Sequence, residues 1–150
     1  MLPTCYVKMD LVVVLDESGS MRPYAADAVS LTESLIPQFA MADSWTRMGV
    51  IEFNHRARVT APFTTDSETV QRGLASYRPG GGTGISEGLK AAERLLSTTN
   101  RSDALQVILL FTDGVQSSYL GGDRVAITSG QQVRMRTGCL LYTSPSPRDS

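Results

Sequence analysis

Two aspartates stand directly behind long aliphatic runs, and hydroxyl side chains gather around the first of them. Asp16 ends one run, and Ser18 and Ser20 follow it; Asp113 comes just after another run. In open parallel sheets, ligands bind beyond the carboxyl ends of the strands. Two carboxylates at that edge need a cation or a proton between them. Carboxylate and hydroxyl oxygens suit a hard cation, so the pattern predicts a magnesium or manganese site.

A third hydroxyl group stands in a glycine-rich loop. The loop, residues 79–84, reads Pro-Gly-Gly-Gly-Thr-Gly and precedes an apolar stripe of helical period. Its glycines let the backbone pass close to an ion, and Thr83 can then offer its hydroxyl oxygen. Read alone, the loop could cradle a phosphate, but no lysine follows it at the spacing of a P-loop.

Two other interpretations of the residues around Asp16 stay open at this point. The segment 16–20 could be a capped turn before a helix, without a ligand. Ser18 could be a nucleophile, but the single histidine, His55, falls in a hairpin turn that we expect away from the site. The sequence around Ser18 is also unlike a nucleophile elbow. We therefore expect no catalytic residues and no enzyme.

Strand and helix patterns alternate along the chain. The runs at 11–15, 48–53 and 107–111 lack polar alternation and predict strands buried on both faces. We expect Trp45 and Met48, near the second run, to belong to the core. Helices are predicted over 24–40, from a capping box at 65–68 to about 77, over 85–96, and weakly over 123–136. Pro37 should kink or end the first helix.

One predicted strand differs from the others. Residues 56–63 alternate between apolar and polar side chains, and they follow Phe53 after two residues, so they must return antiparallel. Pro62 places this strand at the sheet edge, where Arg56 and Arg58 would solvate it. The predicted fold is α/β: a doubly wound, mainly parallel sheet with one antiparallel edge strand and helices on both faces.

Three segments resemble a known family. DESGS at 16–20, GGGTG at 80–84 and FTDG at 111–114 are similar, in order and spacing, to the segments of the von Willebrand factor type A (vWA) domain that form its metal-ion-dependent adhesion site. The resemblance covers about residues 9–138 and implies a Rossmann-like vWA fold. The resemblance implies Mg²⁺ or Mn²⁺ as the cofactor. Carried over position by position, it implies a metal site made of Asp16, Ser18, Ser20, Thr83 and Asp113. Of these, Asp113 would act largely through water.

The resemblance also implies a function. Mostly neutral hydroxyl ligands would leave residual positive charge on the ion, which could then capture an exposed Asp or Glu carboxylate of a protein ligand. The chain would be an adhesion-type, protein-binding module. The alternative is an intracellular vWA subunit that assembles a multi-protein machine of the chelatase or stress-response type. A signal peptide or neighbouring domains in the full gene would separate the two.

Composition excludes several partners. The chain has 150 residues, 14 Lys and Arg against 15 Asp and Glu, and a net charge of −1, so it has no broad field for nucleic acid. Its apolar runs fall far short of the roughly 20 residues that cross a bilayer, so we expect no membrane span. No secretory signal is visible at its start. The location stays unknown, although the resemblance favours an extracellular or cell-surface one.

The end of the chain differs in character from the rest. Residues 139–149, CLLYTSPSPRD, resemble the translation of a transposase adapter used in sequencing libraries, while the origin of Ser150 is open. We therefore expect a vWA-like domain at 1–138, truncated before its last strands, and a non-native tail at 139–150. Setting the tail aside leaves Cys5 as the remaining cysteine, and we expect no disulfide.

Overall fold

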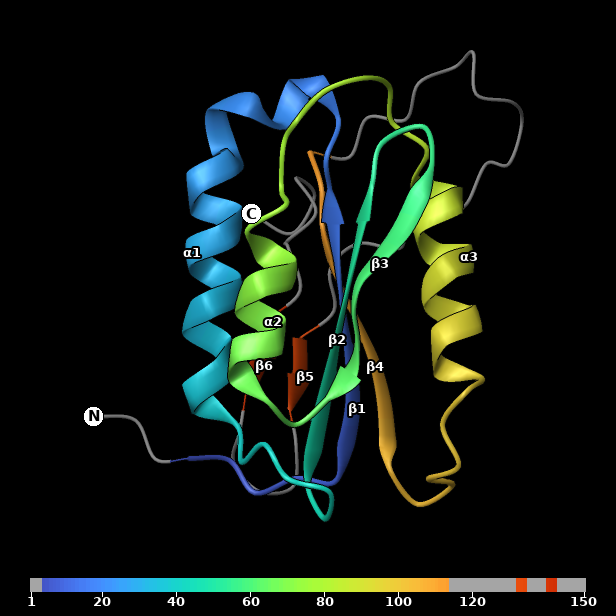
Figure 1. Cartoon of the computed structure of the whole chain (residues 1–150). Coiled ribbons are helices and arrows are strands. Elements are labelled where there is room, and N and C mark those ends of the chain that lie inside the picture. Colours follow the sequence, from blue (N-terminus) through green and yellow to red (C-terminus); the bar gives the residue numbers. More distant parts are fainter. Residues whose placement is uncertain (1–3, 114–131, 135–139, 143–150) are drawn as a thin grey trace.

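A four-stranded sheet forms the centre of the molecule (Figure 1). The computed structural model describes residues 4–113, 132–134 and 140–142. The strand order is β3-β2-β1-β4, and β1 pairs in parallel with β2 and β4, whereas β3 is antiparallel to β2 at the edge. The bounds are β1 (Met9–Asp16), β2 (Thr46–Phe53), β3 (Ala57–Thr64) and β4 (Leu105–Phe111). The predicted mainly parallel sheet with one antiparallel edge strand is confirmed.

Helices cover both faces of this sheet, as predicted. Figure 1 shows α1 and α2 on one face and α3 on the other. The helical segments are η1 (Gly19–Tyr24, a 3₁₀ helix), α1 (Ala25–Leu35), η2 (Ile36–Gln38, also 3₁₀), α2 (Ser67–Leu74) and α3 (Ile85–Leu96). Alternate residues of β1 face the two layers: Leu11, Val13 and Leu15 pack with α1 and α2, and Val12 and Val14 pack with α3.

The first two helices end and begin close to the predicted positions. The α-helical part of the first one stops at Leu35, and Pro37 lies in the following 3₁₀ turn, as a proline requires. The second helix is capped differently from the prediction: Asp66, not Thr65, is the N-cap. Its Oδ1 accepts a hydrogen bond of 3.2 Å from the Glu68 backbone N–H.

A short antiparallel pair lies outside the four-stranded sheet. β5 (Gln132–Arg134) pairs with β6 (Leu140–Tyr142). The predicted helix at 123–136 is therefore wrong at residues 132–134, where hydrogen bonds to a neighbouring strand replace the local ones of a helix. Its other residues, 123–131 and 135–136, lie outside the described residues, as do 139 and 143–150 of the expected tail.

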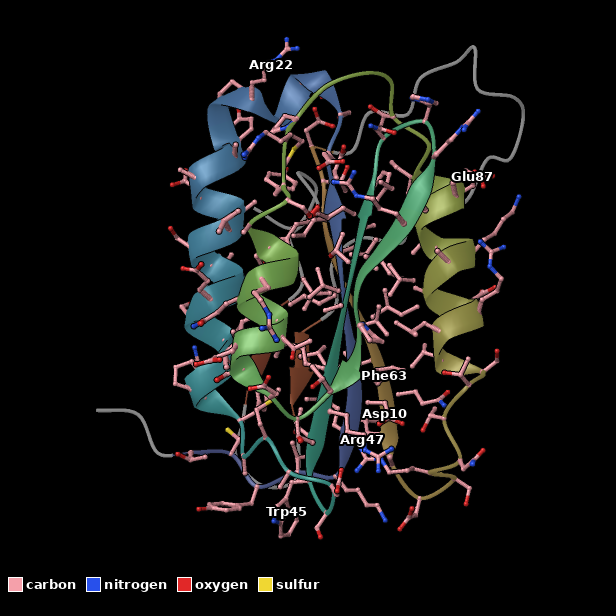
Figure 2. The ribbon with its side chains drawn as sticks, viewed as in Figure 1. Asp10, Arg22, Trp45, Arg47, Phe63 and Glu87 are labelled. Carbon is pink, nitrogen blue, oxygen red and sulfur yellow. The ribbon has the colours of Figure 1, made fainter. Side chains whose placement is uncertain are left out.

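Two expectations near the amino-terminal end of the sheet are wrong. Trp45 is 38% exposed and packs edge-on against Tyr6, with ring centroids 5.7 Å apart, whereas Met48 is buried as predicted. Figure 2 shows Trp45 at the end of the sheet opposite the carboxyl end of β1. Cys5 is disulfide-bonded, and its partner lies outside the described residues. None of the helices in the described part of the chain is long and apolar enough to cross a bilayer.

Candidate metal centre

The register of the sheet places Asp16 beside the residue that precedes Asp113. Leu15 of β1 pairs with Phe111 of β4, so Asp16 and Thr112 come next on adjacent strands. The Thr112 hydroxyl donates a 2.7 Å hydrogen bond to Asp16 Oδ2, and the Ser18 backbone N–H donates one of 2.8 Å to Oδ1. Both carboxylate oxygens of Asp16 are thereby oriented by the protein, and each keeps further acceptor capacity.

The two serines follow in a tight turn. Ser18 is the N-cap of η1 in an extended conformation, and the Met21 N–H donates to its carbonyl oxygen at 3.0 Å. The buried side chain of Met21 fixes this turn against the rest of the molecule. The hydroxyl oxygens of Ser18 and Ser20 lie 3.1 Å apart. The structure thus brings these two hydroxyls together just beyond the end of β1.

Backbone hydrogen bonds fasten the glycine-rich loop to the turn after β1. The Gly80 N–H donates to the Glu17 carbonyl oxygen at 2.8 Å, and the Gly19 N–H donates to the Gly81 carbonyl oxygen at 3.0 Å. Gly81 has φ +78°, a conformation that a side chain disfavours. The Gly84 N–H donates to the Asn54 carbonyl oxygen at 2.6 Å. The loop is therefore held on both sides of Thr83, which is buried.

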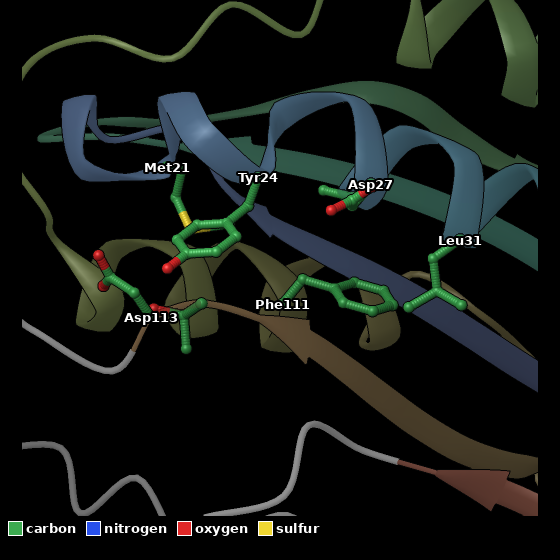
Figure 3. A pocket seen from close by; sticks show the side chains of 8 residues that line it. Met21, Tyr24, Asp27, Leu31, Phe111 and Asp113 are labelled. Carbon is green, nitrogen blue, oxygen red and sulfur yellow. The ribbon is translucent and has the colours of Figure 1, made fainter.

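Asp113 is exposed and lines a groove of about 350 Å³. Figure 3 shows Met21 and Tyr24 of the η1–α1 segment on one wall, and Phe111 and Asp113 at the end of β4 on the other. The charge of Asp113 is close enough to raise the pKa of Asp16. The sequence-predicted residues thus come from three segments that meet at the carboxyl end of the sheet.

Asp16 differs from the other buried carboxylates. Within the described residues, the buried acidic side chains are those of Asp10, Asp16, Glu17 and Glu52. Asp10 pairs with Arg101, and Glu17 and Glu52 share Arg58. Asp16 has no arginine or lysine in its described contacts: hydrogen-bond donors hold its carboxylate, and the charge of Asp113 lies near it. Burial raises the pKa of Asp16, and its hydrogen bonds from Ser18 and Thr112 partly oppose that rise. A cation beside this carboxylate would offset the cost of its burial.

Sequence reasoning missed two residues that hold Asp16. Thr112 could have been found, because its hydroxyl precedes Asp113 at the end of a predicted strand. Tyr77 had no such signal: it lies far from Asp16 in sequence, and its hydroxyl donates to the Asp16 carbonyl oxygen. Burial, followed by the charges of nearby carboxylates, raises the pKa of Tyr77, so its hydroxyl keeps its proton and stays a donor.

Arg58 and His55 make contacts that the sequence did not predict. Arg58 does more than solvate the edge strand, because its Nη2 donates to Glu17 Oε2 at 2.8 Å and to Glu52 Oε2 at 3.3 Å. His55 is exposed in the hairpin turn, as predicted. Its ring nevertheless lies against the glycine-rich loop, since a Cβ atom on Gly81 would stand 3.3 Å from His55 Nδ1.

The candidate metal-binding residues include only two carboxylates. No three His, Cys, Asp or Glu side chains gather as a metal site in the part of the chain that the structure describes. The candidate set instead combines two carboxylates, Asp16 and Asp113, with three hydroxyls, and such all-oxygen sets suit hard divalent cations.

Comparison with known proteins follows the same segments. A family model described as the von Willebrand factor type A domain matches residues 11–116, which include DESGS, GGGTG and FTDG. The chain belongs to the von Willebrand factor type A domain family. The match spans the four-stranded sheet apart from the first residues of β1.

Solved structures carry the same fold. Three domains of the type V pili tip protein Mfa5 from Porphyromonas gingivalis match at 25% identity and TM-score 0.66, over 74% of this vWA chain and 20% of that one. BatB of Bacteroides thetaiotaomicron, a conserved hypothetical protein, matches at 27% identity and TM-score 0.62, over 73% and 56%. Proximal thread matrix protein 1 from the mussel byssus, with a zinc-occupied MIDAS motif, matches at 21% identity and TM-score 0.66, over 77% and 33%.

The structural matches support the fold more than the function. At 21% identity, the byssus protein shows the fold alone. The chain spans between a fifth and about half of the solved proteins named above. What those whole proteins do is therefore a matter for proposal in this one.

Proposed function

We propose that this chain is a metal-ion-dependent, protein-binding module of the adhesion type. Its vWA domain would hold Mg²⁺ or Mn²⁺ and capture an acidic group of a protein ligand. The proposed site residues, some of them acting directly on the ion and Asp113 largely through water, are Asp16, Ser18, Ser20, Thr83 and Asp113. The pilus tip protein Mfa5, similar at 25% identity, supports an adhesive role over that of an assembly subunit.

One observation carries the proposal. Asp16 is a fully buried carboxylate that a hydroxyl and a backbone amide hold, with no arginine in its described contacts, while every other buried carboxylate of the described chain faces an arginine. An uncompensated buried charge is costly, and a divalent cation removes that cost. The residues present therefore fit a metal: an anion fixed at both oxygens, two serine hydroxyls 3.1 Å apart and a buried threonine in the adjoining loop.

Each residue has a definite task in this account. Thr112 and the Ser18 N–H hold the Asp16 carboxylate, and Tyr77 holds its backbone, so the anion meets a cation without reorganising. A bound divalent cation supplies a positive charge that attracts a carboxylate. Three of the five proposed site residues are neutral hydroxyls, and Asp113 would act largely through water, so Asp16 alone would leave positive charge on the ion. An acidic residue of a partner could then approach beside Asp113, along the groove of about 350 Å³.

The same geometry argues against hydrolysis. A general base must lie within hydrogen-bond reach of the proton that it removes. The buried acids Glu17 and Glu52 are already engaged by Arg58, and the Ser18 hydroxyl contacts that of Ser20. We therefore propose binding without catalysis.

Capture of acidic groups is testable with peptide arrays. Peptides with a central Glu or Asp are compared with matched Gln or Asn peptides, in magnesium and in EDTA, using the wild type and Thr83→Ala. Binding to the acidic peptides alone, only with metal, and weaker in Thr83→Ala would support the proposal. Equal binding to Glu and Gln peptides, or binding that survives EDTA, would contradict it.

A further inference from the structure

The segment that leads from α2 to the glycine-rich loop is fastened to the residues around Asp16 at successive points. The Tyr77 hydroxyl donates to the Asp16 carbonyl oxygen, and the Arg78 backbone N–H donates to Glu17 Oε2 at 2.8 Å. The Gly80 N–H donates to the Glu17 carbonyl oxygen at 2.8 Å. Glu17 thus binds the segment twice, with its side chain at Arg78, five residues before Thr83, and with its backbone at Gly80, three residues before it.

Arg58 determines where the Glu17 carboxylate lies. It comes from β3, and its Nη2 donates to Glu17 Oε2 at 2.8 Å, to Glu52 Oε2 at 3.3 Å and to the Ser76 carbonyl oxygen at 3.2 Å. The side chains of Glu17 and Glu52 are 4% and 0% exposed. Without the guanidinium, two buried carboxylates would repel each other with no cation between them. Ser76, the third partner, belongs to the same α2-to-loop segment.

We propose that Arg58, acting through Glu17, is a positioning residue of the metal centre. By neutralising Glu17, it keeps the loop that carries Thr83 in register with the turn that carries Ser18 and Ser20. This inference rests on the proposed function for its effect on metal affinity. Its effect on the loop is a property of the metal-free protein. Arg58 touches none of the proposed ligands in the described contacts, so its influence passes through Glu17 and the backbone N–H groups that Glu17 accepts.

The chain contains a matched control for this role. At the opposite end of β1, Arg101 Nη2 lies 2.6 Å from Asp10 Oδ1 and also donates to the Met9 carbonyl oxygen. Figure 2 shows Asp10 near Trp45 and Arg47, away from the carboxyl end of the sheet. Arg101 therefore neutralises a buried carboxylate as Arg58 does, but its contacts within the described residues lie away from the loops of the site. Its loss should reduce stability without moving those loops.

The experiment compares Arg58→Met and Arg58→Lys with Arg101→Met and Arg101→Lys in the full chain. Backbone hydrogen exchange is followed in EDTA at Gly19, Arg78 and Gly80, and Mn²⁺ affinity is measured by calorimetry. We expect Arg58→Met to speed exchange at those three N–H groups relative to the Arg101 variants, and to weaken Mn²⁺ binding by about tenfold to a hundredfold. Arg58→Lys keeps the charge and should restore part of the slow hydrogen exchange and part of the Mn²⁺ affinity. If Arg58→Met does not fold, Arg58→Lys is compared with Arg101→Lys instead.

Each result bears on one claim. If exchange at the three N–H groups is the same in Arg58 and Arg101 variants of equal stability, the positioning role is wrong, whatever the metal does. If the wild type binds Mn²⁺ and both Arg58 variants bind it as tightly, the role is likewise wrong, while the proposed function stands. If the wild type and Asp16→Ala take up Mn²⁺ equally, the proposed metal site fails, and hydrogen exchange still decides whether Arg58 positions the loop.

Discussion

The side chain of Asp16 has the most unusual environment of any acid in the described part of the molecule. It is buried, held by the Thr112 hydroxyl and the Ser18 N–H, and without an arginine. Burial raises its pKa, which means that the charged form lowers the stability of the metal-free protein at pH values above that pKa. The charge of Asp16 is thus a cost to the metal-free fold, which either protonation or a bound cation would remove.

Asp16→Asn should therefore stabilise the metal-free protein at pH 8, raising Tm in EDTA by roughly 2–6 °C. The difference should shrink toward acidic pH, where the wild-type carboxyl becomes neutral. In saturating magnesium the order should reverse, because only the wild type gains binding free energy, about 2.7 kcal/mol at a hundred times Kd. Thermal melts at both pH values, with and without metal, check this; a wild type more stable than Asp16→Asn in EDTA at pH 8 would contradict it.

Glu52, which is not a proposed ligand, gives a second pH dependence. Burial raises its pKa to about 7, and the nearby charge of Glu17 adds to that rise, while Ser76 and Arg58 oppose it. Since the unfolded chain has the lower pKa, stability from this group is present at acidic pH and lost as the pH rises to about 7. The loss is at most about 3.5 kcal/mol, since burial moves the pKa from 4.5 to about 7 and each pKa unit corresponds to about 1.4 kcal/mol.

Glu52→Gln should remove this part of the pH dependence. It keeps a side chain that Ser76 can bond and removes the charge, so the free energy of unfolding should vary less between pH 4.5 and 8 than in the wild type. Glu68→Gln, at an exposed position on α2, is the control and should leave the wild-type profile unchanged. Urea unfolding over this pH range is the measurement, and parallel profiles for wild type and Glu52→Gln would contradict the account.

At the scale of elements, α3 lies close to β2 at a glycine. A Cβ atom on Gly88 would stand 2.6 Å from Phe53 Cδ1 and 2.9 Å from its Cγ. Gly88→Ala should therefore destabilise the protein by about 1–3 kcal/mol from overpacking, more than the roughly 1 kcal/mol that alanine gains in a helix. Gly80→Ala is the control, because a Cβ atom there would meet nothing within 4 Å beyond its chain neighbours, and it should stay within about 0.5 kcal/mol of wild type. A Gly88→Ala protein as stable as the wild type would show that α3 can shift outward.

The sequence predicted elements better than contacts between distant residues. Continuous apolar runs located β1, β2 and β4, and the alternation with Pro62 located the antiparallel edge, because period and burial are local properties of the chain. The roles of Tyr77 and Arg58 could not be read this way, since each acts on a residue at the other side of the site. The strand at 132–134 was mistaken for helix because its pairing with 140–142 is non-local.

For the whole molecule, the boundary between the vWA domain and the tail at 139–150 remains our proposal. Deleting residues 139–150 from a Cys5→Ser chain should leave Tm within about 2 °C of the undeleted Cys5→Ser chain. Cys5→Ser is needed in both, because the deletion also removes Cys139 and with it any contribution from the Cys5 disulfide. Thermal melts of the two chains are compared; a drop of more than several degrees would show that the tail packs against the domain.

The central claim is that the carboxyl end of this sheet binds a divalent cation through Asp16, and calorimetric titration of the full chain with Mn²⁺ and Mg²⁺ tests it most directly. Asp16→Ala removes the buried anion, and Asp43→Ala removes a highly exposed aspartate whose pair with Arg47, at 3.6 Å, contributes little. We predict one ion per chain for wild type and Asp43→Ala and none for Asp16→Ala. A wild type that takes up no metal, or equal uptake by wild type and Asp16→Ala, would contradict the account.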